Sequence, residues 1–211
     1  MKNLTNKMQQ IFKIIKKMRE KSYDSERESS DFELGSETEE KSQKEEQILK
    51  NKELIKAISK TLTLILDENM KMSNYDEIVK KQSKNKFSTN KEPKISVYDY
   101  LVRIQTYSHI EKNTLIISLI YIDKLCHKNN IFLTYYNVHR ILFSAIIMAI
   151  KYNEDAFYDN KYYSEIAGLS LNELKVLEFT FIKLCDFNLF VHDDIFENYS
   201  TYLHSFEKNN L

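Results

Sequence analysis

Five charged residues interrupt or end apolar helical segments, and they are the side chains in this chain best placed to do chemistry. They are Arg103, Asp123, Arg140, Lys151 and Glu178. A charge in an apolar segment is costly unless it is paired, so these residues indicate internal ion pairs or a polar binding surface. The two Arg are the more informative cations, because most cations of this chain are Lys.

Signatures of catalysis are missing from the sequence. The five His residues never form a ligand-like i, i+4 pair, and we find no Gly-rich phosphate loop, nucleophile elbow or local Ser/His/Asp set. We therefore expect no catalytic residue, no metal site, no cofactor and no small-molecule substrate. The pattern is typical of a helical interaction domain rather than an enzyme.

The bulk composition favours an all-α fold. Only two Gly and one Pro occur, too few for the many tight turns of an all-β protein. The formal net charge is zero, so neither nucleic acid nor a membrane is expected as the main partner. Cys126 and Cys185 lie in apolar periodic segments without metal-ligand spacing, which predicts buried reduced thiols in an intracellular protein. No apolar run approaches the roughly 18 residues that a membrane span needs.

The N-terminal part divides into four segments of different character. Residues 1–21 alternate apolar and basic positions as an amphipathic helix, expected to dock on the domain or a partner helix; membrane-surface binding or targeting is the alternative. Residues 22–47 are acidic and predict a disordered linker. Residues 48–69 carry one apolar stripe and predict a helix that packs on the domain. Residues 70–94 are Lys-rich and predict a solvated loop rather than a phosphate-binding patch, because Arg and aromatic residues are not interleaved.

From residue 95 to 191 the sequence predicts five helices in close succession. The third, 134–151, is apolar on almost every side and should be enclosed by the others. A further amphipathic helix, capped by Asp193 or Asp194, falls in the C-terminal segment 192–211. The expected starts are Ser96 with Asp99 for the first helix, Asn113 or Thr114 for the second, Thr134 for the third, and Ser170 with Glu173 for the fifth. Gly168 is expected to end the short fourth helix.

Three stretches in this order resemble the cyclin box of the P-type (plant U-type) cyclins. They are ISVYDYLVRIQTYSHI, LIISLIYIDKL and LTYYNVHRILFSAIIMAIKYNEDAFYDNKYYSEIAGLSLNELKVLEFTFIKLCDFNLFV. These cyclins are single-box activating subunits of cyclin-dependent kinases and are related to the yeast phosphate-response cyclin. The resemblance covers 95–191 and implies an all-α fold, a single five-helix cyclin box with flanking N-terminal and C-terminal helices.

The resemblance also implies roles for individual residues. Lys151 and Glu178 match the Lys and Glu whose polar centre contacts the kinase where its regulatory helix begins. Asp155 matches a residue that meets an activation-segment Arg of the kinase in the yeast relative. Arg103 and Asp123 match a first-helix Arg and a second-helix Asp that form a structural ion pair inside the box.

The residues themselves also allow plainer interpretations. Lys151 alone could serve as a favourable charge at a helix C-terminus, and Glu178 could lie on a solvated helix edge. For Arg140 we expect an internal salt bridge or an amphipathic stem at the surface of the box. His139 is expected to be a packed, hydrogen-bonded core residue rather than a ligand.

The function implied by the resemblance is regulatory. The chain would bind the regulatory-helix region of a cyclin-dependent serine/threonine kinase and shift it to the active conformation, in the nucleus or the cytoplasm, without being an enzyme itself. The rival is a cyclin-fold nucleic-acid-binding or transcription-factor module that uses the Lys-rich loop and the basic first helix. Such a module should show two tandem boxes and an Arg-rich face, whereas this chain has one box and few Arg.

Overall fold

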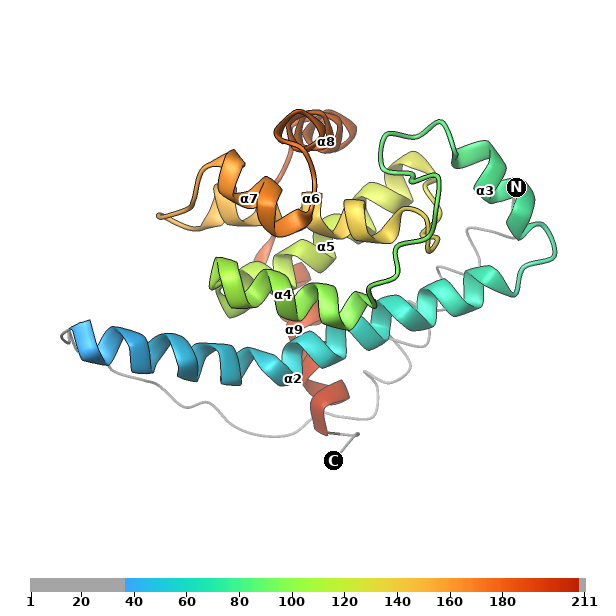
Figure 1. The fold of residues 1–211 in the computed structure, drawn as a ribbon. Coiled ribbons are helices and arrows are strands. Elements are labelled where there is room, and N and C mark those ends of the chain that lie inside the picture. Colours follow the sequence, from blue (N-terminus) through green and yellow to red (C-terminus); the bar gives the residue numbers. More distant parts are fainter. Residues whose placement is uncertain (1–36, 209–211) are drawn as a thin grey trace. The chain divides into compact units, whose positions relative to one another are not determined.

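The computed structural model describes the backbone of residues 37–208 and the side chains of residues 51–205. Within these residues the chain forms eight α-helices and no β-strand, which confirms the all-α prediction. Figure 1 shows the helices in sequence order, from α2 in blue to α9 in red. The predicted helix 1–21 and residues 22–36 of the predicted linker lie outside the described residues.

Helix α2 (Glu37–Met70) contains the predicted helix 48–69 but begins about three turns earlier. The prediction of a disordered linker was therefore wrong for residues 37–47. Most residues of this stretch are Glu, Lys and Gln, which are good helix formers. From residue 51 onward, where side chains are described, most of the predicted apolar stripe of α2 is buried, with Ile58 and Leu62 fully enclosed. The Asn51 side chain donates to the carbonyl of Ile110 at 2.9 Å, so the helix is also tied to the box by a buried hydrogen bond.

A second helix, α3 (Tyr75–Gln82), lies inside the segment predicted to be a loop. Its first turn carries Asp76 and Glu77 and its last turn Lys80 and Lys81, an order that suits the helix dipole. The same four residues form two i, i+4 acid–base pairs along the sequence, which further favour a short helix. Charge composition alone suggested a loop because α3 has no buried residue and so no apolar period.

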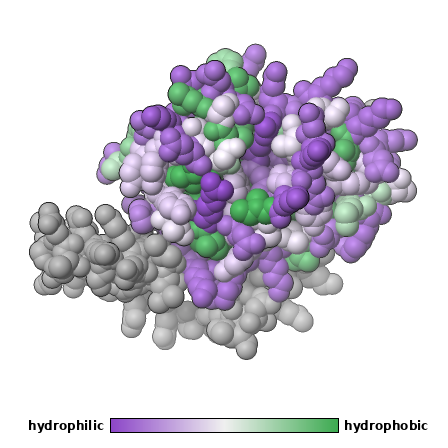
Figure 2. Space-filling model, in the orientation of Figure 1, coloured by the Kyte–Doolittle hydropathy of each residue, from purple (hydrophilic) through white to green (hydrophobic). Residues whose placement is uncertain are grey.

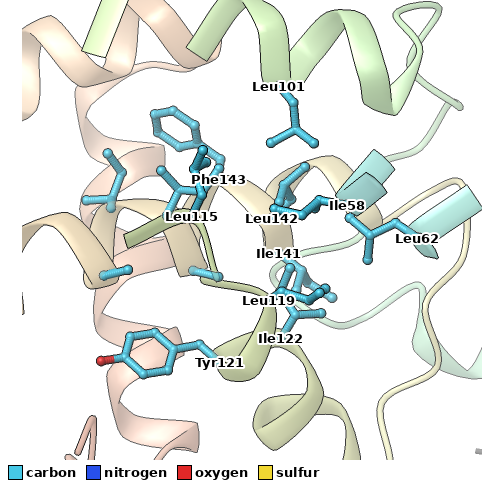
Figure 3. Close-up of a cluster of buried hydrophobic side chains, with 14 of the residues drawn as sticks. Ile58, Leu62, Leu101, Leu115, Leu119, Tyr121, Ile122, Ile141, Leu142 and Phe143 are labelled. Atoms are coloured by element: carbon cyan, nitrogen blue, oxygen red, sulfur yellow. The ribbon is translucent and has the colours of Figure 1, made fainter. Parts of the chain in front are cut away.

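The box consists of α4 (Val97–Ser108), α5 (Lys112–Asn129), α6 (Val138–Asn153), α7 (Asn160–Ala167) and α8 (Leu171–Leu184). Helix α6 packs against α4, α5 and α8, and α7 contacts α4 and α8. Figure 3 shows apolar side chains of α2, α4, α5 and α6 meeting in one core, among them Ile58, Leu101, Leu119 and Leu142. The central helix of the box is therefore enclosed by its neighbours, as its apolar sequence predicts.

Several of the predicted helix boundaries are confirmed by hydrogen bonds. The Ser96 side chain caps α4 by accepting from a backbone N–H three residues on. Ser170 and Glu173 form the complete capping box at the start of α8. Gly168 ends α7 with a φ of 69°, the left-handed conformation that glycine adopts without strain.

Two predicted starts were displaced. Helix α5 begins at Lys112 with Glu111 at its N-cap position, ahead of the predicted Asn113 or Thr114. Helix α6 begins at Val138, because Asn137 first closes a turn in which its side chain accepts from the backbone N–H of Thr134 at 2.9 Å. At α6 a polar side chain thus favours a local turn over the helix that the pattern alone suggests, whereas α5 extends beyond its predicted start without a side-chain cap.

The last helix, α9 (Asp193–Lys208), packs against α5 and begins at the predicted aspartate. Cys126 and Cys185 are both buried and free, and burial raises the pKa of each thiol, so both stay protonated at neutral pH. No helix in the described part of the chain is long and apolar enough to span a membrane.

Candidate functional site

Three helices bring Lys151, Glu178 and Asn160 together at the surface, in what we name the polar cluster. Lys151 lies in the last turn of α6, and its Nζ pairs with Glu178 Oε1 and donates to Asn160 Oδ1. Asn160 Nδ2 donates to the second carboxylate oxygen, Glu178 Oε2. The Lys and Glu side chains keep 23% and 12% of their exposure, so a partner can still reach both charges.

The polar cluster is held by well-packed backbone. Ile150 and Phe181, beside the two charged residues on α6 and α8, are fully buried, and Leu177 is almost so. The start of α7 is fixed by Asp159, whose carboxylate caps the helix by accepting from a backbone N–H of the first turn. Asn160 is therefore positioned by a helix start, while the two charges are positioned by the core.

Sequence reasoning found Lys151 and Glu178 but missed Asn160. The spacing of nine residues from Lys151 falls across a loop, where no helical period connects the two positions. The available signal was the Asp159–Asn160 pair just ahead of the segment KYYSEIA, because Asp and Asn are preferred where a helix starts.

Exposed aromatic side chains accompany the polar cluster. Tyr152 and Phe179 each directly follow a charged member of the cluster in sequence, and they are 54% and 61% exposed. Phe157 lies in the loop between α6 and α7 together with Asp155, and both are exposed. Exposed aromatic residues that neighbour charged residues in the sequence favour a protein-binding surface.

The loop after α8 presents a further aromatic residue on strained backbone. Asp186 and Phe187 both have positive φ, 51° and 56°, and Phe187 is 69% exposed. The left-handed conformation costs roughly 1–2 kcal/mol for a residue other than glycine. The loop is held in place by an ion pair between Lys128 and Asp186 and by the Tyr121 hydroxyl, which donates to the carbonyl of Leu189 at 2.6 Å. Strain retained at an exposed aromatic residue is a feature of functional surfaces.

The predicted ion pair between Arg103 and Asp123 was wrong. Both lie in the described part of the chain, but Arg103 is exposed and donates to the carbonyl of Glu165 at 3.3 Å. Asp123 instead accepts from the Tyr199 hydroxyl of α9 at 2.8 Å, and burial raises the pKa of its carboxyl. A neutral hydroxyl reaches the half-buried carboxylate without burying a second charge, which explains why the arginine can remain in solvent.

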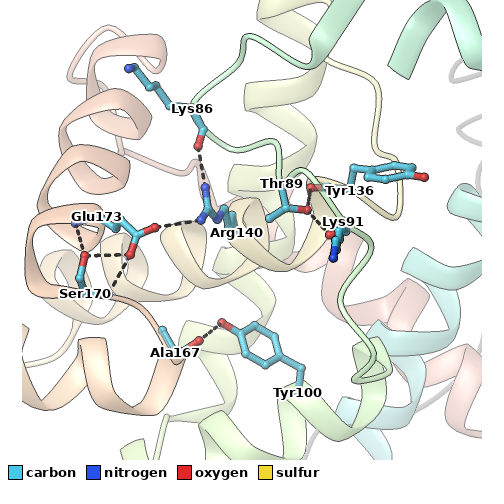
Figure 4. A network of polar contacts seen from close by, with 9 residues as sticks. All are labelled: Lys86, Thr89, Lys91, Tyr100, Tyr136, Arg140, Ala167, Ser170 and Glu173. Atoms are coloured by element: carbon cyan, nitrogen blue, oxygen red, sulfur yellow. Dashed lines mark hydrogen bonds and ion pairs between the residues drawn. The ribbon is translucent and has the colours of Figure 1, made fainter. Parts of the chain in front are cut away.

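The structure confirms the plainer interpretations of Arg140 and His139. The Arg140 guanidinium pairs with Glu173 at 3.1 Å and donates to the carbonyl of Lys86 at 3.4 Å, as Figure 4 shows. His139 is buried beside Tyr100, with its ring Nε2 2.9 Å from the carbonyl of Ile95, and burial lowers its pKa. Neither residue belongs to the polar cluster.

No group of three or more His, Cys, Asp or Glu side chains in the described residues could hold a metal ion.

Comparison with known proteins gives consistent matches to one family. A family model described as Cyclin matches residues 5–189. The PHO85 cyclin-like protein psl1 of Schizosaccharomyces pombe is 31% identical over 165 residues, covering 75% of this chain and 68% of the relative. Cyclin-U2-1 of Arabidopsis thaliana is 35% identical over 118 residues, covering 56% and 53%. PHO85 cyclin-7 of Saccharomyces cerevisiae is 30% identical over 173 residues, covering 73% and 61%.

The match therefore spans only about half to two thirds of the length of these relatives. The family model nevertheless matches most of this chain, and the all-helical fold agrees with it. The chain belongs to the cyclin family, in the P/U-type group related to the yeast PHO85 cyclins.

Proposed function

We propose that this chain is the activating regulatory subunit of a cyclin-dependent serine/threonine kinase, bound through the polar cluster. The observation that carries the proposal is the partly exposed ion pair of Lys151 and Glu178, fixed by Asn160 at the junction of three helices. A pair of opposite charges that is already oriented can exchange hydrogen bonds with a partner at low entropic cost. Two relatives are named as PHO85 cyclins or cyclin-like proteins, which supports a kinase as the partner.

The surroundings of the polar cluster support a protein partner of substantial size. The exposed rings of Tyr152, Phe157 and Phe179 provide apolar area next to the charges, and Phe187 extends the apolar surface on the loop after α8. Aromatic residues at the centre of an interface commonly carry much of its binding energy. Asp155 is exposed on the same loop as Phe157, so its carboxylate is available to a guanidinium of the kinase activation segment.

The proposed mechanism is a shift of the conformational equilibrium of the kinase. A kinase needs its regulatory helix in the inward position to align the nucleotide, and without a partner it populates that position poorly. A rigid surface that binds only the inward position stabilises it by the difference between its affinities for the two positions. The buried neighbours of the polar cluster, Ile150 and Phe181, give this surface the required rigidity. Phosphoryl transfer itself would be carried out by the kinase.

Replacing either charge of the polar cluster tests this function directly. We expect Lys151→Ala or Glu178→Ala to weaken kinase binding by about 2–5 kcal/mol, because truncating one member leaves the other charge unpaired in the interface. The measurement is a calorimetric titration against the kinase that co-purifies with this protein, together with kinase activity at saturating and subsaturating amounts of each variant.

A matched control is Lys52→Ala, which removes an exposed lysine of α2 and should leave the affinity unchanged. Circular dichroism should show the same helix content in all variants, since the apolar neighbours that hold α6 and α8 in the core, Ile150, Leu177 and Phe181, are unchanged. Wild-type affinity in Lys151→Ala and in Glu178→Ala would exclude the polar cluster from the interface.

A further inference from the structure

The segment 80–94, which we name the lysine segment, presents a dense positive surface. It contains one acidic residue, Glu92, and six exposed lysines: Lys80, Lys81, Lys84, Lys86, Lys91 and Lys94. Among the ion pairs of the described residues, none involves these lysines, although lysines elsewhere on the surface do form them. On the right of Figure 2, where α3 and the lysine segment lie, hydrophilic residues predominate.

The lysine segment is anchored, contrary to the solvated loop that the sequence predicts. Phe87 is fully buried and packs edge-on against Phe181 of α8, with ring centroids 6.3 Å apart. The Gln82 side chain exchanges two hydrogen bonds with the backbone of Phe132, at 3.2 and 3.0 Å. The Thr89 backbone N–H donates to the carbonyl of Tyr136 at 2.9 Å. The backbone is thus held at three points while the lysine side chains remain in solvent.

Neighbouring groups neutralise this surface only in part, because Asp76 and Glu77 lie one helical turn before Lys80 and Lys81, and Glu92 lies within the segment. The nearby carboxylate of Glu173 is taken by Ser170 and Arg140, and its hydrogen bonds to Ser170 lower its pKa. In Figure 4 the carbonyl of Lys86 accepts from Arg140, while the ammonium group of Lys86 points away from the network. The remaining excess of ammonium groups on fixed backbone is complementary to a flexible negative segment.

The chemistry of the lysine segment favours carboxylates over nucleic acid. Its one aromatic ring, Phe87, is buried, so it offers no platform on which bases could stack. The adjacent Arg140 is engaged with Glu173 and Lys86, so the planar guanidinium that recognises phosphate in two contacts is not available. Ammonium groups act as point charges that pair with carboxylates or phosphates in many orientations. The buried ring and the engaged guanidinium are therefore the features that disfavour nucleic acid.

We infer that the lysine segment is a docking surface for an acidic segment of a protein substrate of the kinase complex. This inference rests on the proposed function, and the geometry allows both contacts at once. The lysine segment meets the start of α6 at Tyr136 and Arg140, whereas Lys151 lies at its far end. Arg140 and Lys151 are about 16 Å apart along the axis at 1.5 Å per residue.

The inference is tested by titrating the full-length protein, without kinase, into a fluorescein-labelled peptide of Asp, Glu and Ser. Fluorescence anisotropy at low and near-physiological salt should show binding that weakens as salt rises. The triple variant Lys81→Gln, Lys84→Gln and Lys86→Gln should bind about tenfold more weakly, because several exposed charge pairs are lost together. The charge-matched control removes exposed lysines of α2, namely Lys52→Gln, Lys56→Gln and Lys60→Gln, and should bind as the wild type does.

Three results would overturn the inference. They are no binding by the wild type, an equal loss in the two triple variants, and tighter binding of a single-stranded oligonucleotide of the same charge, which would indicate a nucleic-acid surface. Because the titration contains no kinase, these results leave the proposed function untouched. Conversely, wild-type kinase affinity in both Lys151→Ala and Glu178→Ala would overturn the proposed function without affecting peptide binding.

Discussion

Glu178 uses both of its carboxylate oxygens inside the polar cluster. Oε1 pairs with Lys151 and Oε2 accepts from Asn160, so the plane of the carboxylate is fixed by two neighbours on different helices. Asn160 also accepts from Lys151, which closes a triangle of hydrogen bonds. The amide is neutral, so its contribution is to orient the two charges rather than to add a third.

This role of Asn160 can be separated from a simple contribution to folding. We expect Asn160→Ala to reduce kinase affinity by about 1–2 kcal/mol, because each charged residue loses one hydrogen bond that holds it in position. Asn160→Asp should reduce affinity as well, since it places a second carboxylate against Glu178 and weakens the orientation of the pair. Kinase affinity and melting temperature should be measured for both variants. A lower melting temperature with wild-type affinity would make Asn160 purely structural.

At the residue scale, sequence and resemblance together predicted the two charges but not their common partner. Glu178 stands out as a carboxylate on an apolar helix ridge, whereas Lys151 is a favourable charge at a helix C-terminus and was singled out by the resemblance. Asn160 carries no such signal, because an Asn near a helix start is ordinary. The failed pairing of Arg103 has a similar cause. Tyr199, the actual partner of Asp123, is distant in sequence and on a helix whose docking position no local pattern predicts.

At the scale of elements, apolar period predicted every box helix, whereas polar detail decided where each began. Helix α6 was predicted from Thr134 and starts after Asn137, because a side-chain hydrogen bond stabilises a turn there. Helix α3 was missed because its stabilisation is electrostatic and local rather than apolar. The lysine segment was misjudged for the opposite reason. A single buried ring, Phe87, anchors a stretch whose composition is otherwise that of a solvated loop.

The packing of α9 on α5 makes a prediction about pH at the scale of elements. Burial raises the pKa of Asp123 above that of an unfolded Asp, so the charged carboxylate destabilises the fold once the pH exceeds the folded pKa. Below the pKa of an unfolded Asp, about 3.9, both states are protonated and the penalty vanishes. Asp123→Asn removes this titration and keeps an acceptor for Tyr199.

We therefore expect Asp123→Asn to be more stable than the wild type at neutral pH and to lose this advantage as the pH falls from the raised pKa of Asp123 towards that of an unfolded Asp, about 3.9. Denaturant unfolding of the two proteins over a pH series measures the difference, and comparing the two cancels the contributions of other carboxylates. A variant that is less stable at neutral pH would show that the charged hydrogen bond from Tyr199 outweighs the burial penalty. Asp123→Ala, which also removes the acceptor, is the control for loss of the hydrogen bond.

At the scale of the whole domain, α6 separates two surfaces of different character. One end carries the polar cluster with its aromatic surroundings, and the other meets the anchored lysine segment. The helix between them is buried in the core on nearly every side, so it is a rigid spacer rather than a hinge. We propose that one surface binds the kinase while the other binds the substrate, and that the spacer fixes the distance between the two.

This separation predicts that the two surfaces act independently. The substituted charges lie toward opposite ends of α6, and sites more than about 7–10 Å apart usually have additive effects, within about 0.3–0.5 kcal/mol. The two surfaces share one buried neighbour, Phe181, which lies beside Glu178 and packs against Phe87 of the lysine segment. Combining Lys151→Ala with the triple lysine variant should therefore weaken kinase binding only as much as Lys151→Ala alone. It should likewise weaken binding of the acidic peptide only as much as the triple variant alone. The coupling energy is measured by titrating the kinase and the acidic peptide separately against the wild type, Lys151→Ala, the triple lysine variant and the combined variant. A coupling energy well above that limit would show that a change passes between the two surfaces, through α6 or through the contact of Phe87 with Phe181.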